Sequence, residues 1–398
     1  MKRFRNWKLI LISVALFWLP LGLYAEEGLT DTEIHIASWG PQTGPAAAWG
    51  SVSRAIDAYF KMINAEGGIH GRKVIYHHFD DAYNPAKTIA GVKQLQESSH
   101  GIFAWVVGVG TAPGMAVKDY LMERKTPWVG PATGSEVWTN PPNKYLFATY
   151  PYYFNEAQIL VRYAAKTMNK KRIAIVYQND EYGKSGLRGA EKELGKLGME
   201  LAAALPLNVM EKDLKPLIME LKNAQADTVL LWLTPSAAVR TVGTGKAMQF
   251  DTQWMSTSTC SDFPLLYKIS RGVIEGMITG SFGLIADSDD PLLMKYKTDA
   301  FEKYAPKDER WGIFWYAGIG FMEPIVEGLK MAGRDLSREK LVAEMEKIED
   351  FQGIFGKISY KPFDINDPKS RQGQHSVFLI QSIEDGKTKI LTDWMTVD

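Results

Sequence analysis

The residues best suited to bind a small molecule lie in the segment 37–50, which reads ASWGPQTGPAAAWG. Residues 33–37 before it alternate in polarity and predict a strand. Apolar residues recur at helical spacing over 52–63 and predict a helix after it. Glycine and alanine let backbone N–H groups approach a guest closely, and the N-terminus of a helix suits a carboxylate. Trp39 and Trp49 could supply apolar walls, although an ordinary strand-to-helix turn is the alternative interpretation.

Five further loops of similar composition follow predicted strands. They are residues 108–114, 130–135, 178–183, 234–236 and 256–259. All are rich in hydroxyl groups, aromatic rings and small residues, and poor in Lys, Arg and His. Loops at the carboxyl ends of parallel strands are the usual ligand sites of such sheets. This composition favours binding of a small molecule that is partly polar and partly apolar, without chemical conversion.

Catalytic and metal-binding patterns are weak in this chain. Residues 108–114 follow a strand but lack the GxGxxG spacing, and no acidic residue ends the next strand. His77 and His78 are adjacent, so on a strand they point to opposite faces and cannot share a metal; the remaining histidines show no ligand spacing. Asp80 and Asp81 are expected to cap a turn. We therefore expect no enzyme activity, no metal site and no cofactor.

The first 25 residues have the pattern of a signal peptide. A basic start precedes the apolar stretch 9–23, and Ala25 stands at an acceptable cleavage position. The apolar stretch is shorter than the roughly 20 residues that a membrane-spanning helix needs, and no later segment is long and apolar enough. An uncleaved anchor is the alternative. We expect an exported, periplasmic protein.

The expected mature chain of 373 residues is too long for a single core and fits two domains. Without the four basic residues of the signal, 42 Lys and Arg face 46 Asp and Glu, so nothing favours nucleic acid as a partner. Cys260 is the only cysteine, so no intrachain disulfide can form despite export.

Predicted strands and helices alternate along the mature chain. Further strands are predicted at 73–79, 103–107, 127–129, 173–177, 201–205 and 228–233, and helices at 85–96, 112–123, 187–197, 215–223, 237–249, 313–331 and 338–348. Repeated strand–helix units imply mostly parallel sheets with helices on both faces. A change of lobe is predicted near Tyr150-Pro151, before a helix starting at Asn155 with Gln158 in capping-box spacing. Beyond residue 357 we expect antiparallel strands with a turn at Asp385-Gly386.

Taken together, several segments closely resemble the leucine-type periplasmic binding proteins, the solute receptors of ABC importers for branched-chain and hydrophobic amino acids. The likeness is carried by Gly40-Pro-Gln-Thr-Gly-Pro, Trp49-Gly50, residues 64–73, Gly130-Pro-Ala-Thr, Asp180-Glu-Tyr-Gly183 and Gly353-x-x-Gly356, and covers essentially the whole mature chain. It implies the type I periplasmic binding protein fold, an α/β protein of two doubly wound lobes with a three-segment hinge. The implied lobes are 31–149 plus 277–360, and 150–276 plus 361–398.

The resemblance also implies roles for individual residues. Trp49 matches an aromatic lid over the ligand side chain, and Thr111 a hydroxyl that holds the ligand carboxylate. Ala132 matches the carbonyl that receives an ammonium, while Tyr182 and Trp232 match aromatic residues facing the ligand from the second lobe. Packing or capping is the alternative for each. The expected ligand contacts are Trp49, Gly110, Thr111, Ala112, Ala132, Thr133, Ser135, Tyr150, Tyr182, Trp232 and Ser258.

One loop departs from the family pattern. Amino-acid binders of the family usually carry an acidic residue in the sixth loop, which here reads STSTCS over 256–261. A buried ammonium without a carboxylate partner is costly, so either Asp262 or Glu181 substitutes or the ligand is not a simple α-amino acid. The predicted function is capture of branched-chain or other hydrophobic amino acids by a monomer that delivers them to a membrane permease. The alternatives are uptake of an aromatic carboxylate or short amide, and a ligand-sensing module.

Overall fold

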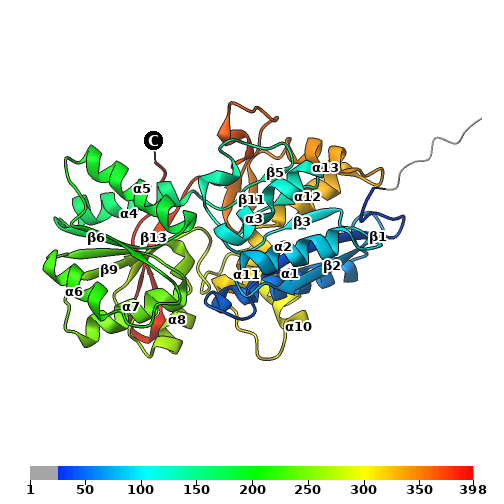
Figure 1. Cartoon of the computed structure of the whole chain (residues 1–398). Helices are drawn as coiled ribbons and strands as arrows, with labels where there is room; N and C mark the ends of the chain where they lie inside the picture. The colour runs from blue at the N-terminus through cyan, green and yellow to red at the C-terminus, as the bar shows by residue number, and fades with distance from the viewer. Residues whose placement is uncertain (1–25, 398) are drawn as a thin grey trace, which may run out of the picture.

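The chain folds into two α/β lobes that lie side by side, and each lobe draws on separate stretches of the sequence (Figure 1). The computed structural model describes residues 26–397. The signal peptide expected at residues 1–25 lies outside the described residues. Within residues 26–397, no helix combines the length and the apolar character that crossing a membrane requires.

The first lobe is built on a five-stranded parallel sheet in the order β2-β1-β3-β4-β5. Its strands are β1 (Glu33–Gly40), β2 (Lys73–Asp80), β3 (Ala104–Val106), β4 (Trp128–Val129) and β5 (Leu146–Phe147). Its helices are α1 (Ser51–Ala65), α2 (Pro85–Gln96), α3 (Thr111–Glu123) and, from later in the chain, α9 (Pro291–Tyr296), α10 (Glu302–Tyr304), α11 (Ile313–Gly320), α12 (Glu323–Ala332) and α13 (Arg338–Met345). A small hairpin of β11 (Phe351–Gly353) and β12 (Gly356–Ile358) follows. Because the strand order reverses between β1 and β3, the loops after these strands open a crevice of the kind that binds ligands.

The second lobe contains a seven-stranded sheet in the order β14-β13-β10-β9-β8-β6-β7. The parallel strands are β6 (Ile173–Gln178), β7 (Ala203–Leu207), β8 (Thr228–Trp232), β9 (Gln253–Ser256) and β10 (Ile278–Ser281), and β13 (Phe378–Ser382) and β14 (Thr388–Ile390) complete the sheet in antiparallel pairs. The helices are α4 (Tyr153–Arg162), α5 (Glu181–Lys196), α6 (Lys215–Asn223), α7 (Pro235–Ala247) and α8 (Phe263–Ser270). The parallel part repeats the strand order of the first sheet. The expected doubly wound α/β class is therefore confirmed.

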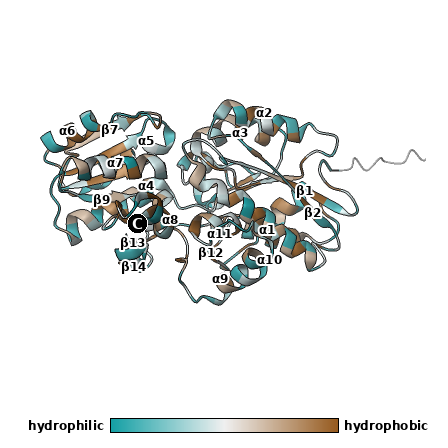
Figure 2. Ribbon diagram, turned by 90° about the horizontal axis from the view of Figure 1, so that it is seen from below, coloured by the Kyte–Doolittle hydropathy of each residue, from teal (hydrophilic) through white to brown (hydrophobic). Residues whose placement is uncertain are grey.

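Buried apolar residues surround the sheet of each lobe and join in one contiguous cluster. Strand β8 is buried along its whole length, as expected for a parallel strand covered on both faces. In the first lobe, the ring of Trp39 packs 5.7 Å from Trp105 and 5.1 Å from Trp128. Figure 2 shows hydrophobic residues concentrated along the strands, with hydrophilic residues on the outer helices. This buried core holds both sheets in place and so supports the loops at their edges.

Two local predictions about helices are wrong. The predicted helix over 313–331 is divided into α11 and α12, because Pro324 has no N–H to donate and its ring would clash with the carbonyl four residues earlier. Helix α4 begins at Tyr153 rather than Asn155, without a side-chain cap. The amide of Gln158 instead donates to the Phe154 carbonyl at 3.2 Å, so the expected capping box is absent.

Two expected lobe boundaries lie later in the chain than the sequence indicated. Strand β10 pairs with β9 and β13, so residues 278–281 belong to the second sheet and the chain returns to the first lobe only after them. The backbone of Ala148 in the first lobe accepts from Gly373 N and donates to Arg371 O, both at 2.8 Å. Residues 361–373 therefore stay with the first lobe, and the last crossing follows Gly373.

A buried carboxyl group ties α4 to the loop after β9. Glu156 accepts hydrogen bonds from the hydroxyls of Ser258 at 2.9 Å and Thr257 at 3.1 Å, and from the Ser258 backbone. Gly280 of β10 lies so close that a Cβ there would stand 2.3 Å from a Glu156 oxygen. Burial raises the pKa of the Glu156 carboxyl to about 7, although the hydrogen bonds from Ser258 and Thr257 act in the opposite direction.

Replacing this carboxyl group should change the pH dependence of stability. An acid whose pKa is higher in the folded state keeps its proton there, so its contribution to the free energy of unfolding falls as pH rises from about 4.5 to about 7. We expect the wild type to lose roughly 1 to 3 kcal/mol relative to Glu156→Gln between about pH 5 and about pH 8. Urea unfolding of both proteins at the two pH values measures this difference. A difference independent of pH would contradict the prediction.

Candidate ligand-binding cleft

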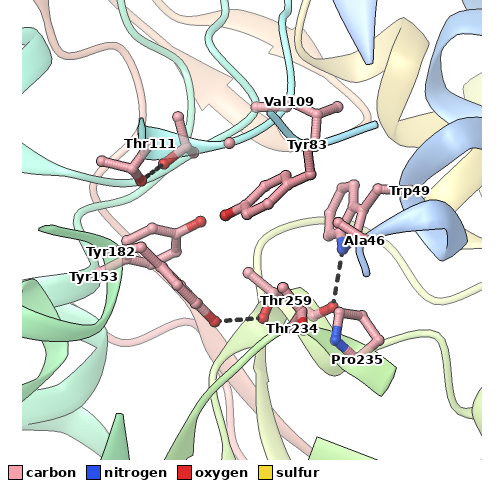
Figure 3. A pocket seen from close by; sticks show the side chains of 13 residues that line it. Ala46, Trp49, Tyr83, Val109, Thr111, Tyr153, Tyr182, Thr234, Pro235 and Thr259 are labelled. Carbon is pink, nitrogen blue, oxygen red and sulfur yellow. Dashed lines mark hydrogen bonds between the residues drawn. The ribbon is translucent and has the colours of Figure 1, made fainter. Parts of the chain in front are cut away.

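A cavity lies between the two lobes, where the carboxyl ends of both parallel sheets face each other (Figure 3). It contains about 340 Å³ of space free of protein atoms, its open mouth included. The lining residues are Ala46, Trp49, Tyr83, Val109, Gly110, Thr111, Ala132, Thr133, Tyr153, Tyr182, Thr234, Pro235 and Thr259. Each comes from a loop or helix start that follows a strand or a lobe crossing.

The N-terminus of α3 forms one polar wall of the cavity. Gly110 precedes the helix and has no side chain to cap it, so the first backbone N–H groups of α3 have no side-chain acceptor there. The hydroxyls of Thr111 and Thr133 are buried and hydrogen-bonded to each other beside this helix end. Unpaired N–H groups, a positive dipole end and hydroxyl donors together suit a carboxylate.

Only glycine fits at position 110. Its backbone has φ 103°, a region that side chains other than hydrogen rarely allow. A Cβ there would lie 2.5 Å from the ring of Tyr83 and 3.1 Å from Pro113. Gly110 therefore lets the α3 N-terminus and the Tyr83 ring approach the same space.

The opposite wall comes from the second lobe. The Tyr182 hydroxyl donates to the Leu233 carbonyl at 3.1 Å and lies 2.8 Å from the Thr259 hydroxyl. Thr234 precedes α7 without capping it, and among the described residues its buried hydroxyl has no hydrogen-bond partner. A buried hydroxyl without a partner costs free energy, so Thr234 is a natural partner for a polar group of a guest.

The two lobes contact each other across the cavity. The indole N–H of Trp49 donates to the Thr259 carbonyl at 3.2 Å, and the Ser236 hydroxyl donates to the Pro45 carbonyl at 2.7 Å. Trp49 is only 4% exposed and its ring packs 4.6 Å from Phe314. The structure thus shows a closed arrangement in which Trp49 of the first lobe reaches the second.

Charged groups are kept away from the cavity. Within residues 26–397, no Asp, Glu, Lys, Arg or His lines it. Asp262, expected as a possible ammonium partner, instead accepts from Leu265 N at 3.1 Å and Phe314 N at 3.2 Å, and lines a different recess. Glu181 pairs with Arg188 outside the cavity. Burial raises the pKa of Tyr83 above its usual value, so its ring stays neutral.

The structure places the sequence-predicted residues in two groups. Those that line the cavity are Trp49, Gly110, Thr111, Ala132, Thr133 and Tyr182; those that do not are Ala112, Ser135, Tyr150, Trp232 and Ser258. Ala112 is the second residue of α3, where its contribution to a guest would be a backbone N–H. The Ser135 hydroxyl accepts from Val137 N at 3.5 Å and so caps a short turn.

The side chains of three residues outside the cavity make contacts in the hinge and in the interior of the second lobe. The Tyr150 hydroxyl lies 2.8 Å from the Ser258 hydroxyl, and the Tyr150 ring packs 4.6 Å from Phe282. Ser258 is also bound to Glu156. Trp232 is fully buried, and a Cβ at Gly186 would stand 2.2 Å from its ring. Their side chains therefore hold the hinge and second lobe in place instead of facing the cavity.

Two aromatic residues of the cavity were missed in the sequence. Tyr83 follows the carboxyl end of β2, where its backbone N–H donates to Asp81 at 2.9 Å and its φ is 59°. The same rule that selected the other strand-end loops would have found it. Tyr153 is the first residue of α4, directly after the lobe crossing. Only the meeting of the two lobes brings it into the cavity.

Two doubly wound lobes closed over a small neutral cavity define a solute-binding protein. Residues 33–387 match the family described as periplasmic binding protein, and the chain belongs to that family. The chain is 30% identical over 222 residues to the Leu/Ile/Val-binding protein homolog 3 of Brucella melitensis, a match that covers 55% of this chain and 58% of that relative.

Other similarities extend along more of the chain. The leucine-, isoleucine-, valine-, threonine-, and alanine-binding protein of Pseudomonas aeruginosa is 24% identical over 339 residues, covering 85% of this chain and 88% of the relative. The fatty acid ABC transporter substrate-binding protein from Thermomonospora curvata superposes with a TM-score of 0.83 at 23% identity, covering 95% of this chain and 96% of that one. The structural match confirms the type I fold.

A side chain at position 110 should destabilise the protein. We expect Gly110→Ala to lower the free energy of unfolding by roughly 1 to 3 kcal/mol, because the positive φ is strained for alanine and its Cβ meets the Tyr83 ring. The matched control is Gly195→Ala in α5, where a Cβ meets nothing within 4 Å and alanine favours the helix. Denaturant unfolding measures both. Equal stability of the two variants would contradict the prediction.

Proposed function

We propose that the protein is the extracytoplasmic substrate-binding component of an ABC importer and captures branched-chain or other hydrophobic amino acids. The observation that carries this proposal is the pairing, in one small cavity, of the uncapped α3 N-terminus with apolar walls. The relatives from Brucella melitensis and Pseudomonas aeruginosa, whose names state branched-chain amino acids, support the same substrate class. The captured ligand would then pass to a membrane permease.

The polar contacts of the cavity suggest how such a ligand is oriented. Its carboxylate would accept from the first N–H groups of α3 and from the hydroxyls of Thr111 and Thr133. Its ammonium would find only neutral oxygen acceptors, of which the Ala132 carbonyl and the unpaired hydroxyl of Thr234 lie on the lining. Hydrogen bonds to several neutral oxygens would lower the free-energy cost of burying the ammonium, compared with an ammonium that has no partner.

The ligand side chain would pack against the apolar part of the lining. This part consists of Ala46, Trp49, Val109 and Pro235. Burying an aliphatic group contributes about 0.8 kcal/mol per CH₂. Because Trp49 also donates to Thr259 across the cleft, closing over the side chain and joining the lobes are one event. A ligand that contacts both lobes therefore favours the closed arrangement.

The absence of a carboxylate favours a second candidate. No acidic side chain among the described residues lines the cavity, so a carboxylate ligand without an ammonium group would avoid the cost of burying that charge. An aromatic or aliphatic carboxylate meets the α3 N-terminus and the apolar wall equally well. A short amide would use the same hydroxyls but gain less from the helix dipole.

A panel of matched ligands separates these candidates. We expect L-leucine to raise the melting temperature of the protein, and 4-methylpentanoate, which lacks only the ammonium group, to raise it less. At 100-fold over its Kd a ligand stabilises by roughly 2.7 kcal/mol. L-leucinamide, which lacks the carboxylate, should have no effect. If 4-methylpentanoate or benzoate stabilises the protein and leucine, isoleucine and valine do not, the amino-acid proposal fails and the second candidate replaces it.

Removing one hydroxyl should weaken binding without altering the fold. We expect Thr111→Val to reduce the affinity for the stabilising carboxylate ligand by about tenfold, because it removes a hydrogen-bond donor and keeps the shape of the side chain. Thr111→Ser restores the hydroxyl and should retain most of the affinity. Isothermal titration calorimetry measures both. Wild-type affinity in Thr111→Val would show that this wall does not hold the carboxylate.

A further inference from the structure

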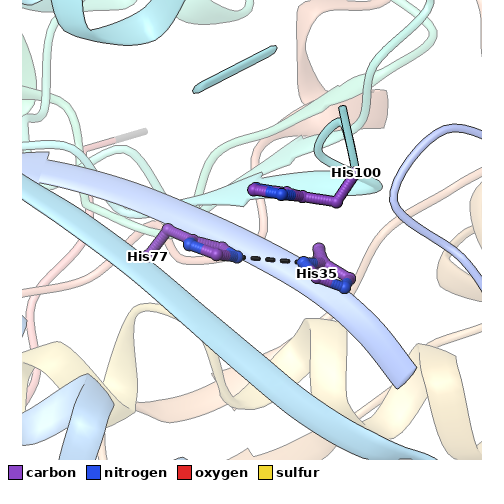
Figure 4. Close-up of side chains that lie close together, drawn as sticks. All are labelled: His35, His77 and His100. Carbon is purple, nitrogen blue, oxygen red and sulfur yellow. Dashed lines mark hydrogen bonds between the residues drawn. The ribbon is translucent and has the colours of Figure 1, made fainter. Parts of the chain in front are cut away.

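Three histidines that are far apart in the sequence lie together on the first lobe (Figure 4). His35 belongs to β1, His77 to β2, and His100 to the loop before β3. The Nδ1 atom of His35 lies 3.0 Å from Nε2 of His77, and the ring of His100 is centred 4.7 Å from each of the other two rings. One ring nitrogen of each histidine lies within 4.8 Å of the others. Half of the six histidines of the chain meet here.

The backbone holds these three side chains in register. The parallel pairing sets Ala37 opposite His77, so His35, two residues before Ala37, presents its side chain on the same face of the sheet as His77. The carbonyl of His100 accepts from Gly28 N at 2.9 Å, and the Gly28 carbonyl accepts from His35 N at 2.7 Å. The loop that carries His100 is therefore fastened to the strand that carries His35.

The three histidines differ in their exposure to solvent. His35 is 7% exposed, His77 is half-buried, and His100 is exposed, so the group is anchored on one side and open to solvent on the other. Burial, together with the neighbouring His100 and His35, lowers the pKa of His77 to about 4. Burial likewise lowers the pKa of His35. Burial therefore favours the neutral form of His35 and His77, which is the form that metal ions bind.

A carboxylate stands behind the most buried histidine. The Nε2 atom of His35 lies 3.3 Å from a carboxylate oxygen of Glu33, while its Nδ1 atom faces His77. Glu33 can thus accept a hydrogen bond from the Nε2–H group of His35, which leaves the Nδ1 lone pair free to face the cluster. Metal-binding histidines usually have such a carboxylate, which fixes the tautomer and makes the imidazole a better ligand.

We propose that His35, His77 and His100 form a binding site for one divalent transition-metal ion, with Zn²⁺ as the best match. Imidazole suits zinc, copper and nickel, and three histidines with one open position form an established type of zinc coordination. Nitrogens bound to one tetrahedral zinc are about 3.3 Å apart, given a Zn–N distance of about 2.0 Å. The three rings are stacked, with interplanar angles of 10° to 22°, so the side chains must turn for one nitrogen of each to face the ion, and water would fill the fourth position.

The position of the site indicates what the ion does. β1 runs from Glu33 through His35 to Gly40 and then into the loop that lines the cleft, and His100 precedes β3. The cluster therefore lies toward the amino end of the sheet, away from the ligand cavity. An ion here joins β1, β2 and the loop before β3, and stabilises the first lobe without contacting the ligand. This inference is independent of the proposed function.

Metal titration of the mature chain without a histidine tag tests the proposal. After treatment with EDTA and its removal, we expect calorimetry to show one Zn²⁺ per chain at neutral pH, a raised melting temperature, and no response to Mg²⁺, which prefers oxygen ligands. His100→Ala, at an exposed position, should weaken Zn²⁺ binding at least tenfold, as should His77→Ala. Cobalt substitution should give the absorption bands of a tetrahedral site, and the two variants should lose them.

His78→Ala is the matched control, because His78 is the next residue on β2 and points to the opposite face. It should bind Zn²⁺ as the wild type does. The proposal is overturned if the wild type binds no Zn²⁺, if His77→Ala and His100→Ala both bind it with wild-type affinity, or if His78→Ala loses as much affinity as they do. His100 is exposed, so its replacement leaves the core intact. If His77→Ala does not fold, the result with His100→Ala decides the test.

Discussion

The whole arrangement depends on two parallel sheets whose carboxyl edges face each other. A parallel sheet needs a helix for each crossover, so every strand of this kind ends in a loop or a helix start on the same edge. When two such edges meet, as they do here around the cavity, loops from many parts of the chain converge on one small space. The cavity is thus a consequence of topology, and the residues in the loops decide what it can hold.

The contents of those loops make the cavity neutral. Hydroxyl groups, aromatic rings and an uncapped helix N-terminus can orient a ligand although none of them carries a net charge. The available carboxylates serve structural purposes instead: Asp262 caps α8, and Glu156 binds the loop after β9. In a site shielded from water, such fixed dipoles act more strongly than they would in solution. Because the cavity is neutral, a ligand with an ammonium group must bury that charge without a carboxylate partner, and a ligand without the group avoids this cost.

Much of the framework could be predicted from local patterns. Helices α2 and α6 begin and end at the predicted residues, and a turn lies at Asp385-Gly386 as predicted, with positive φ at both residues. The predictions were less accurate where the position of a residue depends on contacts with residues far away in the sequence. Strand β10 looked like the start of the first lobe but pairs with β9 and β13, and Trp232, expected at the ligand, is buried against Gly186. Pairing partners and packing depth are not local properties.

The sequence by itself determined the alternation of strands and helices, the composition of the strand-end loops and the family resemblance, because these rest on spacing and residue type over short stretches. Only the tertiary structure decided which loop residues face the cavity, that Asp262 and Glu181 do not, and that Tyr83 and Tyr153 do. It also brought His35, His77 and His100 together. The physical reason is the same in each case: strand register and lobe closure set the distances between residues far apart in the chain.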